Sequence, residues 1–195
     1  MSRRFYIGIP TGRMNTVYAA QRNTQWCWAA AIEMILRYYG IEISQEAIVY
    51  RAYGLDWRGQ PPNREATYEA MAKNLNDWGI DFKGQFFVVR ASFHWGPPPL
   101  ETLIRELSAQ RPVLLSYISR TFPRLAGHAV VATALQIEQL PGHPPRALTV
   151  VVRDPWPSRR VLRHRGRLEY PARQFLSKIT SYWIVTAHRK PKVAA

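Results

Sequence analysis

Apolar residues recur at three- and four-residue spacing in the first half of the chain. The period is clearest between residues 26 and 39, where it is carried by Trp28, Ile32, Ile35, Leu36 and Tyr39. This spacing predicts an amphipathic helix over 26–39, with Gly40 at its C-terminal cap. Similar patterns predict helices over 44–53 and 67–78. The first twenty residues have no clear period, so we expect an extended segment there.

Beyond residue 80 the pattern changes to short runs rich in β-branched and aromatic residues. These runs predict strands at 82–89, 113–118, 128–137, 148–152 and 182–187. Helices are expected at 100–109, after three consecutive prolines, and at 172–179. The strands 128–137 and 148–152 are expected to pair through their short connection. A helical half followed by a mostly antiparallel sheet predicts an α+β fold, with two lobes that face each other across a cleft.

The composition supports one folded domain. The chain has 195 residues, of which 47% are hydrophobic and 12% aromatic, enough for a full-sized core. We expect the domain over 1–188, with a helical lobe at about 17–80 and a sheet lobe at about 81–188. Residues 189–195 are expected to be a disordered basic tail. Because the chain has one cysteine, no internal disulfide can stabilise the fold, and nothing indicates an oxidising compartment.

A formal net charge of +14 suggests contact with an anionic surface. The basic side chains are densest in one run made of Arg159, Arg160, Arg163, His164, Arg165 and Arg167. We interpret this run first as a solvated face, and second as a docking surface for an acidic protein such as an inhibitor or immunity protein. Nucleic acid is less favoured, because no zinc-finger spacing, basic zipper or RNA-binding signature accompanies the charge.

Targeting and metal-binding signals are not apparent in the sequence. No segment approaches the roughly 20 apolar residues that a membrane-spanning helix needs. The first ten residues are basic without a long apolar stretch, so we expect no signal peptide and synthesis in the cytoplasm, with export by a dedicated secretion system left open. Neither His-Glu-x-x-His nor paired Cys/His spacing occurs, so no metal or cofactor is expected.

Cys27 is the first candidate for chemistry, because it lies where a loop meets the predicted helix 26–39. A lone cysteine is most often a small buried hydrophobic residue. At the start of a helix, however, unpaired backbone N–H groups and the helix dipole favour a thiolate. A neighbouring base would complete its activation as a nucleophile.

Three further residues could complete an acyl-transfer site. Among five histidines, His128 alone opens a strongly apolar run, so its ring can point into a cleft or be satisfied within the core. Asp154 ends the other strand of the expected pair; it can orient His128, or it is an ordinary turn aspartate. Gln21, six residues before Cys27, is a candidate oxyanion donor together with the Cys27 backbone N–H, or a plain loop side chain.

These residues together resemble the papain-like cysteine proteases of bacteria. Three blocks carry the resemblance: Gln21-x5-Cys27-Trp28-Ala29-Ala30, Gly127-His128-Ala129-Val130-Val131 and Asp154-Pro155-Trp156. The similar subtypes are effector proteases delivered into host cells and double-glycine-leader peptidase domains of peptide exporters. The resemblance implies that Cys27 is the nucleophile, His128 the base, Asp154 the orienting acid and Gln21 the oxyanion donor. It implies cleavage of polypeptides through an acyl-enzyme, and a role as a delivered toxin or effector.

The chain departs from the plant papains, which carry asparagine as the third member and disulfide cysteines beside the nucleophile. Its spacing of 101 residues from Cys27 to His128 is also shorter than the roughly 130–150 of those enzymes, which favours the compact bacterial branch. No inhibitory propeptide is evident before Gln21. Two alternatives stay open: a transglutaminase-like acyltransferase, and a catalytically silent module that binds a partner through its basic surface. Three tryptophans near the predicted site could wall a cleft, but core packing is the favoured interpretation: Trp26, Trp28 and Trp156.

Overall fold

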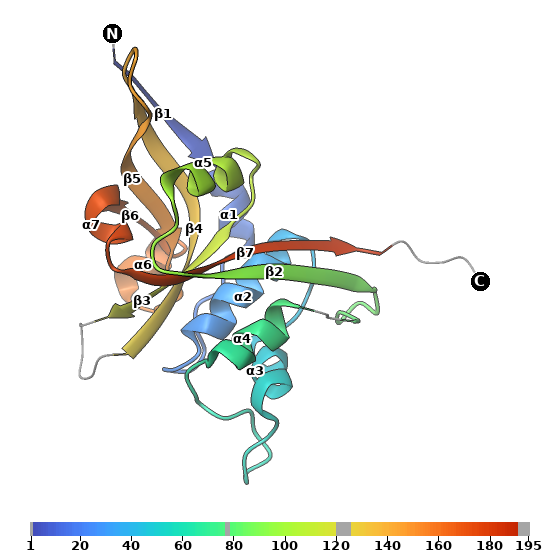
Figure 1. The fold of residues 1–195 in the computed structure, drawn as a ribbon. Coiled ribbons are helices and arrows are strands. Elements are labelled where there is room, and N and C mark those ends of the chain that lie inside the picture. The colour runs from blue at the N-terminus through green and yellow to red at the C-terminus, as the bar shows by residue number, and fades with distance from the viewer. Residues whose placement is uncertain (1, 77–78, 120–125, 191–195) are drawn as a thin grey trace.

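The structure is a computed structural model that describes residues 2–76, 79–119 and 126–190. Its strands are β1 (Arg3–Gly8), β2 (Phe87–Trp95), β3 (Val113–Ser119), β4 (Ala126–Gln139), β5 (Arg146–Arg153), β6 (Arg167–Pro171) and β7 (Ile179–Arg189). Its helices are α1 (Thr11–Val17), α2 (Cys27–Tyr38), α3 (Gln45–Tyr53), α4 (Tyr68–Leu75), α5 (Leu100–Ser108), α6 (Arg159–Arg163) and α7 (Ala172–Leu176). Four helices precede most of the sheet, which is the predicted order (Figure 1).

The strands form one antiparallel sheet in the order β2-β7-β3-β4-β5-β6, with β1 added to β4 (Figure 1). β3 pairs with residues 126–132 of β4, and β1 pairs with residues 134–139. β5 pairs with the other side of β4, which confirms the predicted hairpin. In its register Val131 lies opposite Arg153, so the start of β4 and the end of β5 lie at the same end of the sheet.

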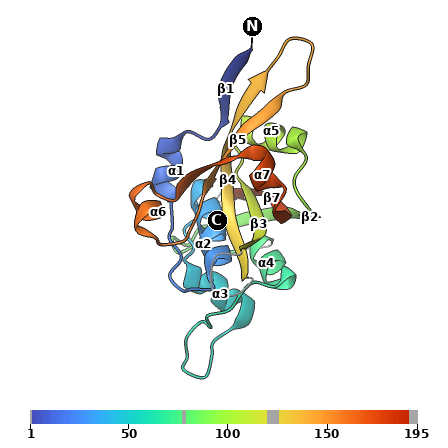
Figure 2. The same cartoon turned by 90° about the vertical axis from the view of Figure 1, so that its left-hand side faces the viewer.

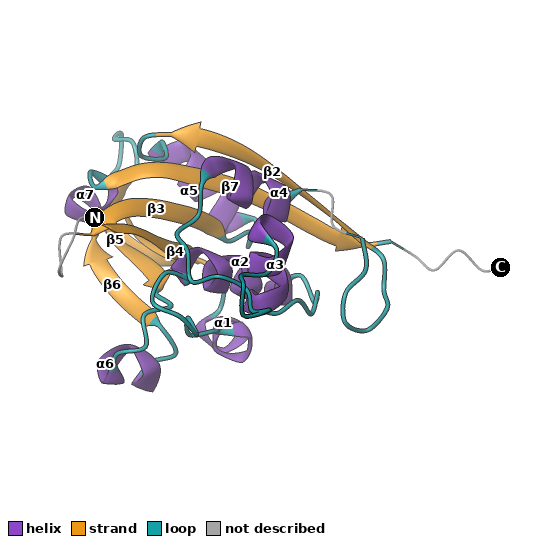
Figure 3. Ribbon diagram, turned by 90° about the horizontal axis from the view of Figure 1, so that it is seen from below, coloured by secondary structure: helices purple, strands orange, loops and turns teal. Residues whose placement is uncertain are grey.

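Helices cover both faces of this sheet. α2, α3 and α4 pack against one face through a core that includes Ile32 and Leu114, and Figure 3 shows α2 and α3 beside the strands. α5 and α7 cover the opposite face, where Leu103 and Phe175 pack with Val130. Figure 2 shows β1 and the β4–β5 hairpin extending away from α2, α3 and α4.

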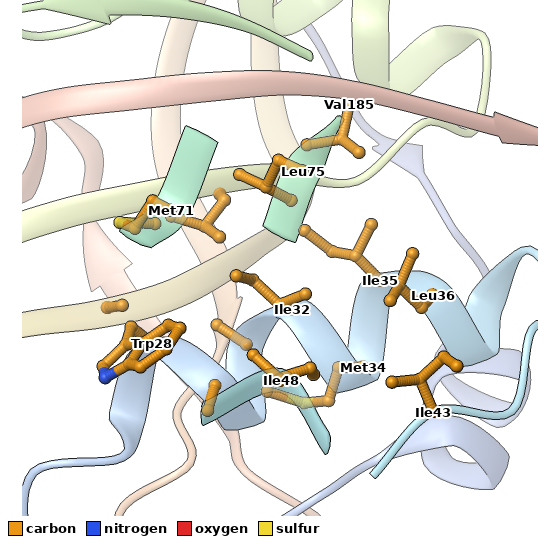
Figure 4. Close-up of a cluster of buried hydrophobic side chains, with 14 of the residues drawn as sticks. Trp28, Ile32, Met34, Ile35, Leu36, Ile43, Ile48, Met71, Leu75 and Val185 are labelled. Carbon is orange, nitrogen blue, oxygen red and sulfur yellow. The ribbon is translucent and has the colours of Figure 1, made fainter. Parts of the chain in front are cut away.

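The central helix α2 is enclosed on almost every side, since eleven of its twelve residues are buried. In Figure 4, Ile32 and Ile35 point toward α4 and β7, while Met34 lies against Ile48 of α3. A helix that is buried on almost every side lies inside the protein, where its packing fixes both ends. The first residue of α2, Cys27, is therefore held on a rigid element.

The N-terminal prediction was correct only in part. The first twenty residues were expected to be an extended segment; β1 is extended, but residues 11–17 form the helix α1. β1 is recognisable only through its pairing with residues 134–139, far along the chain. Its residues 3–6 are exposed, so the segment shows no alternation that would predict a strand.

In the sheet lobe, one further prediction needs correction and one is confirmed. The strand predicted at 82–89 is displaced to β2, because residues 81–85 form a turn in which the Asp81 carboxylate accepts from the N–H groups of Lys83 and Gln85. The basic run 159–167 was predicted to be a solvated face, and its side chains are indeed mostly exposed: Arg159, Arg160, Arg163, His164 and Arg165. The run contains α6, capped by the Ser158 side chain, and leads into the edge strand β6.

Two predicted boundaries, the end of the helix over 67–78 and the start of the tail at 189–195, lie close to residues that the structure does not describe. The helix expected over 67–78 runs from Tyr68 to Leu75, and residues 77–78 are not among those described. Arg189 ends β7, and the Lys190 N–H donates to the Phe86 carbonyl at 2.8 Å, so the predicted tail 189–195 begins inside the sheet. Residues 191–195 lie outside the described part. Within that part, no helix is both long and apolar enough to span a membrane.

Candidate active site

Cys27 is buried at the first position of α2. The N-cap residue Trp26 provides no side-chain cap, so the helix itself leaves the N–H groups of its first turn unpaired at the positive end of its dipole. The flanking tryptophans are fixed, since the indole N–H of Trp26 donates to Pro62 O at 3.0 Å and that of Trp28 to Arg64 O at 3.1 Å. The thiol therefore sits in a rigid position at the positive end of the helix dipole.

His128 and Asp154 meet at the same end of the sheet. His128 Nε2 lies 2.9 Å from Asp154 Oδ1, and both side chains are largely buried. Cys27 Sγ lies 3.8 Å from the carbonyl oxygen of Gly127, the residue just before His128. The structure thus brings the predicted nucleophile, base and acid together. Because Nε2 contacts Asp154, Nδ1 is the ring nitrogen left for Cys27.

The environment of His128 favours its charged form. Burial alone would lower the pKa of His128, because it disfavours the imidazolium. The hydrogen bonds and negative charges of Asp154 and Cys27 outweigh burial and raise the pKa of His128 to about 10. An imidazolium is therefore the stable form at neutral pH, and it stabilises a neighbouring thiolate in return.

Asp154 is held by more than its contact with His128. Its Oδ1 also accepts the Trp156 N–H at 2.8 Å, which is an Asx-turn across Pro155. Its own N–H donates to Gly166 O at 2.8 Å, and Tyr18 Oη donates to its carbonyl oxygen at 3.2 Å. Asp154 is therefore a turn aspartate that also contacts His128, and its role as the orienting acid stays a prediction.

Position 166, which lies against Asp154 and Tyr18, requires a glycine. Its φ of +70° lies in the left-handed region, and a Cβ there would lie 2.6 Å from Asp154 O and would overlap the Tyr18 ring. We expect Gly166→Ala to lower the free energy of unfolding by about 2–3 kcal/mol through strain and overpacking. Urea unfolding measures this loss.

The control for Gly166→Ala is Gly12→Ala. Gly12 lies in α1, and a Cβ there meets no heavy atom within 4 Å. We expect this change to stabilise the protein slightly, by about 0.5–1 kcal/mol, because alanine favours helix more than glycine. Equal effects of the two substitutions would contradict the assignment of a special role to Gly166.

Gln21 is buried, but its amide is already engaged. Its Nε2 donates to Asn23 O at 2.8 Å and Thr24 O at 3.0 Å, while Oε1 is buried without a hydrogen-bond partner. These bonds shape the turn that leads into Cys27. To donate to an oxyanion, Gln21 would have to share or exchange one of them, so its role as a donor stays a prediction.

A cleft of about 180 Å³ opens beside Cys27 and His128. Most of its other walls are apolar or aromatic and come from α4, β2 and β7: Tyr68, Met71, Phe93, Trp95 and Trp183. These residues share no pattern along the sequence, because they lie on three elements that only the fold brings together. Trp28 also lines the cleft, whereas Trp26 is packed in the core. Trp156 is 47% exposed and is not among the lining residues.

The other histidines have other partners. His94 stacks on Tyr182, and His143 contacts Pro141 O within an exposed turn. His164 ends α6, and His188 lies on β7. Within the described residues, no group of three or more His, Cys, Asp or Glu side chains could hold a metal ion.

Comparison with solved structures identifies the fold. The peptidase domain of Streptococcus ComA, a bifunctional ABC transporter involved in a quorum-sensing pathway, is 16% identical, with a TM-score of 0.54 over 89% of this chain and 98% of that chain. Procathepsin B S9 from Trypanosoma congolense is 11% identical, with a TM-score of 0.56 over 94% of this chain and 77% of that chain. At such identities the likeness concerns the fold. No curated protein sequence matches the chain.

The fold is that of the papain-like peptidases, with a cysteine at the start of its central helix. The model of the Peptidase_C39 like family matches residues 14–189, and the chain belongs to that family. The fold class and the enzyme class expected from the sequence are thereby confirmed.

Proposed function

We propose that the protein cleaves polypeptides through a covalent acyl-enzyme on Cys27, with His128 as acid–base and Asp154 as the orienting acid. The observation that carries this proposal is the 2.9 Å contact between His128 and Asp154 directly beside the Cys27 thiol. Asp154 fixes the ring so that Nδ1 serves Cys27, and its charge stabilises the imidazolium. Gln21 and the free N–H groups at the start of α2 are the proposed oxyanion donors.

The proposed reaction has two half-steps. The Cys27 thiolate attacks the peptide carbonyl carbon, and the imidazolium of His128 gives its proton to the departing amine as the C–N bond breaks. Water then attacks the thioester carbon while His128 accepts its proton, and the sulfur leaves as thiolate. The apolar cleft walls favour an extended peptide that places an apolar or aromatic side chain beside the scissile bond.

The test is to trap the intermediate. The protein is incubated with a library of unstructured peptides, quenched in acid, and examined by mass spectrometry for an acyl group on Cys27 and for new peptide amino termini. We expect both from the unsubstituted protein and neither from Cys27→Ala. If new termini appeared equally with Cys27→Ala, the proposed mechanism would be rejected.

The same experiment separates hydrolysis from acyl transfer. An added primary amine would replace water as acceptor in an acyltransferase and yield peptide amides. We expect the free acid as the main product. Peptide amides as the main product would favour the transglutaminase-like alternative, and binding of peptide without any acyl-enzyme would favour the silent module. The acidic partner and the role as a delivered effector stay predictions from the sequence.

The pH profile tests the role of Asp154. Since leaving-group protonation requires the imidazolium, kcat/KM falls as pH rises through the pKa of His128. That pKa is raised to about 10 with Asp154 in place, so the unsubstituted protein should stay active to near that pH. Asp154→Asn removes the negative charge and lowers the pKa of His128, so we expect the alkaline limb to move down by at least about one pH unit.

Glu65→Gln is the matched control for this profile. Glu65 also lines the cleft, but the groups that raise the pKa of His128 are Asp154 and Cys27. We expect its alkaline limb to coincide with that of the unsubstituted protein. An unshifted limb in Asp154→Asn would contradict the orienting role of the carboxylate.

A further inference from the structure

Gln45 is an almost fully buried amide outside the cleft. It is the first residue of α3, and only 1% of it is exposed. Glutamine at the start of a helix is ordinarily a solvated residue, because burying an amide without partners costs free energy. The hydrogen-bond partners of the Gln45 amide therefore indicate which part of the structure it holds in place.

Gln45 bridges the two residues on either side of Gln21. Its Nε2 donates to the carbonyl oxygen of Ala20 at 2.9 Å, and its Oε1 accepts the N–H of Arg22 at 3.0 Å. One side-chain amide thus binds the main chain before and after Gln21, as a neighbouring strand would. This double contact fixes the backbone angles of Gln21 and hence the direction of its side chain.

A buried carboxylate sets the orientation of this amide. Glu33 on α2 is fully buried, and its Oε2 accepts from Gln45 Nε2 at 2.7 Å. Its other oxygen forms an ion pair with Arg37 at 2.7 Å. Because Nε2 must face this carboxylate and the Ala20 carbonyl, Oε1 is left for the Arg22 N–H. The amide therefore cannot flip without placing oxygen against oxygen.

A further hydrogen bond joins the segment 20–22 to the main chain beside Asp154. The Gln21 N–H donates to the carbonyl oxygen of Pro155, the residue after Asp154, at 2.8 Å. The segment 20–22 is thus held between α3 on one side and the end of β5 on the other. Any displacement of this segment would move the candidate oxyanion donor relative to Cys27.

We propose that Gln45, oriented by Glu33, is a positioning residue that acts on catalysis through Gln21. The inference rests on the proposed function, because it assigns Gln21 to the oxyanion in that reaction. Gln45 touches no reacting atom. Its effect belongs to the transition state, since a misplaced donor costs rate without a matching loss of substrate binding.

A double-mutant cycle tests this dependence. Gln45→Met keeps the length of the side chain but removes both main-chain hydrogen bonds. We expect it to lower kcat about 10- to 100-fold with KM within about twofold. In a Gln21→Ala background, already about 100-fold slower, the same substitution should change kcat by less than about twofold, because there is no donor left to misplace.

Val49→Ala is the control for a merely structural effect. Val49 is fully buried on the same helix, and its side chain packs in the hydrophobic core. We expect it to lower the urea midpoint at least as much as Gln45→Met while kcat stays within about twofold. If Val49→Ala lowered kcat as strongly, or if Gln45→Met were equally damaging with and without Gln21, the positioning role would be rejected.

Gln45→Glu provides a second variant, independent of whether Gln45→Met folds. At high pH its carboxylate faces Glu33 and the Ala20 carbonyl and cannot donate, so kcat should be low. As pH falls, the new carboxyl group takes up a proton and can donate one hydrogen bond, to Glu33 or to the Ala20 carbonyl, while its other oxygen accepts from the Arg22 N–H. We therefore expect kcat relative to the unsubstituted protein to rise from pH 8 to pH 5.

The remaining outcomes are also decisive. A kcat ratio for Gln45→Glu that stays constant with pH would overturn the inference. Turnover that Gln45→Met leaves within twofold would overturn the positioning role and leave the proposed function standing. Absence of any turnover in the unsubstituted protein would overturn the proposed function, and this inference with it.

Discussion

Replacement of Cys27 by alanine is expected to lower the rate of peptide cleavage by about 10⁴-fold or more, because no other group can form the acyl-enzyme. The change removes one sulfur at the start of α2, where the backbone is already fixed by the packing of the helix. The fold should therefore persist. Cleavage of the best peptide from the library, followed under single-turnover conditions, measures the loss.

The control for Cys27→Ala is its thermal unfolding profile, which should match that of the unsubstituted protein closely. A variant that keeps its unfolding midpoint and loses turnover separates chemistry from folding. A residual rate above about one-hundredth of the original would mean that the thiol is not the nucleophile.

Replacement of His128 by alanine should have the second-largest effect. We expect cleavage to fall by about 10³–10⁴-fold, since both the thiolate partner and the proton donor are lost. Alkylation by iodoacetamide provides a readout that needs no substrate. At a given neutral pH, Cys27 should react faster in the unsubstituted protein than in His128→Ala, because the variant lacks the imidazolium beside the sulfur.

His143→Ala is the matched control, because His143 lies in an exposed turn between β4 and β5. It should leave both the alkylation profile and the cleavage rate unchanged. Slow alkylation of Cys27 in the folded unsubstituted protein, with the same pH dependence in His128→Ala, would show that no activated pair exists and would remove the basis of the peptidase mechanism.

Local sequence patterns were sufficient where an element carries its own signal. The helix predicted over 26–39 is α2, since its apolar period is visible in one short window. The hairpin of β4 and β5 followed from two apolar runs and a proline-rich connection. Because these two strands pair, the sequence pattern is enough to predict that His128 and Asp154 share one site. β1 and β6, whose exposed edges give no period, could not be found in this way.

The residues that hold the site in place, Gln45 and Gly166, could not be recognised from any pattern in the sequence. Gln45 looks like a solvated residue at the start of a helix, and only the packing of α3 against the segment 20–22 shows what it binds. The same holds for Gly166, whose left-handed conformation matters because Tyr18 and Asp154 lie against it. Both depend on contacts between residues far apart in the chain.

The sequence by itself determined the kind of chemistry: a cysteine at a helix start, with a histidine and an aspartate at the ends of two adjacent strands. These are local properties, set by residue type, periodicity and short-range pairing. The tertiary structure alone decided how that chemistry is supported. It brings together the negative charges that raise the pKa of His128, the aromatic walls of the cleft, and the hydrogen bonds from Gln45 to the main chain on either side of Gln21. The reason is physical, since hydrogen bonds and electrostatic fields depend on distances in space, which periodicity along the chain does not encode.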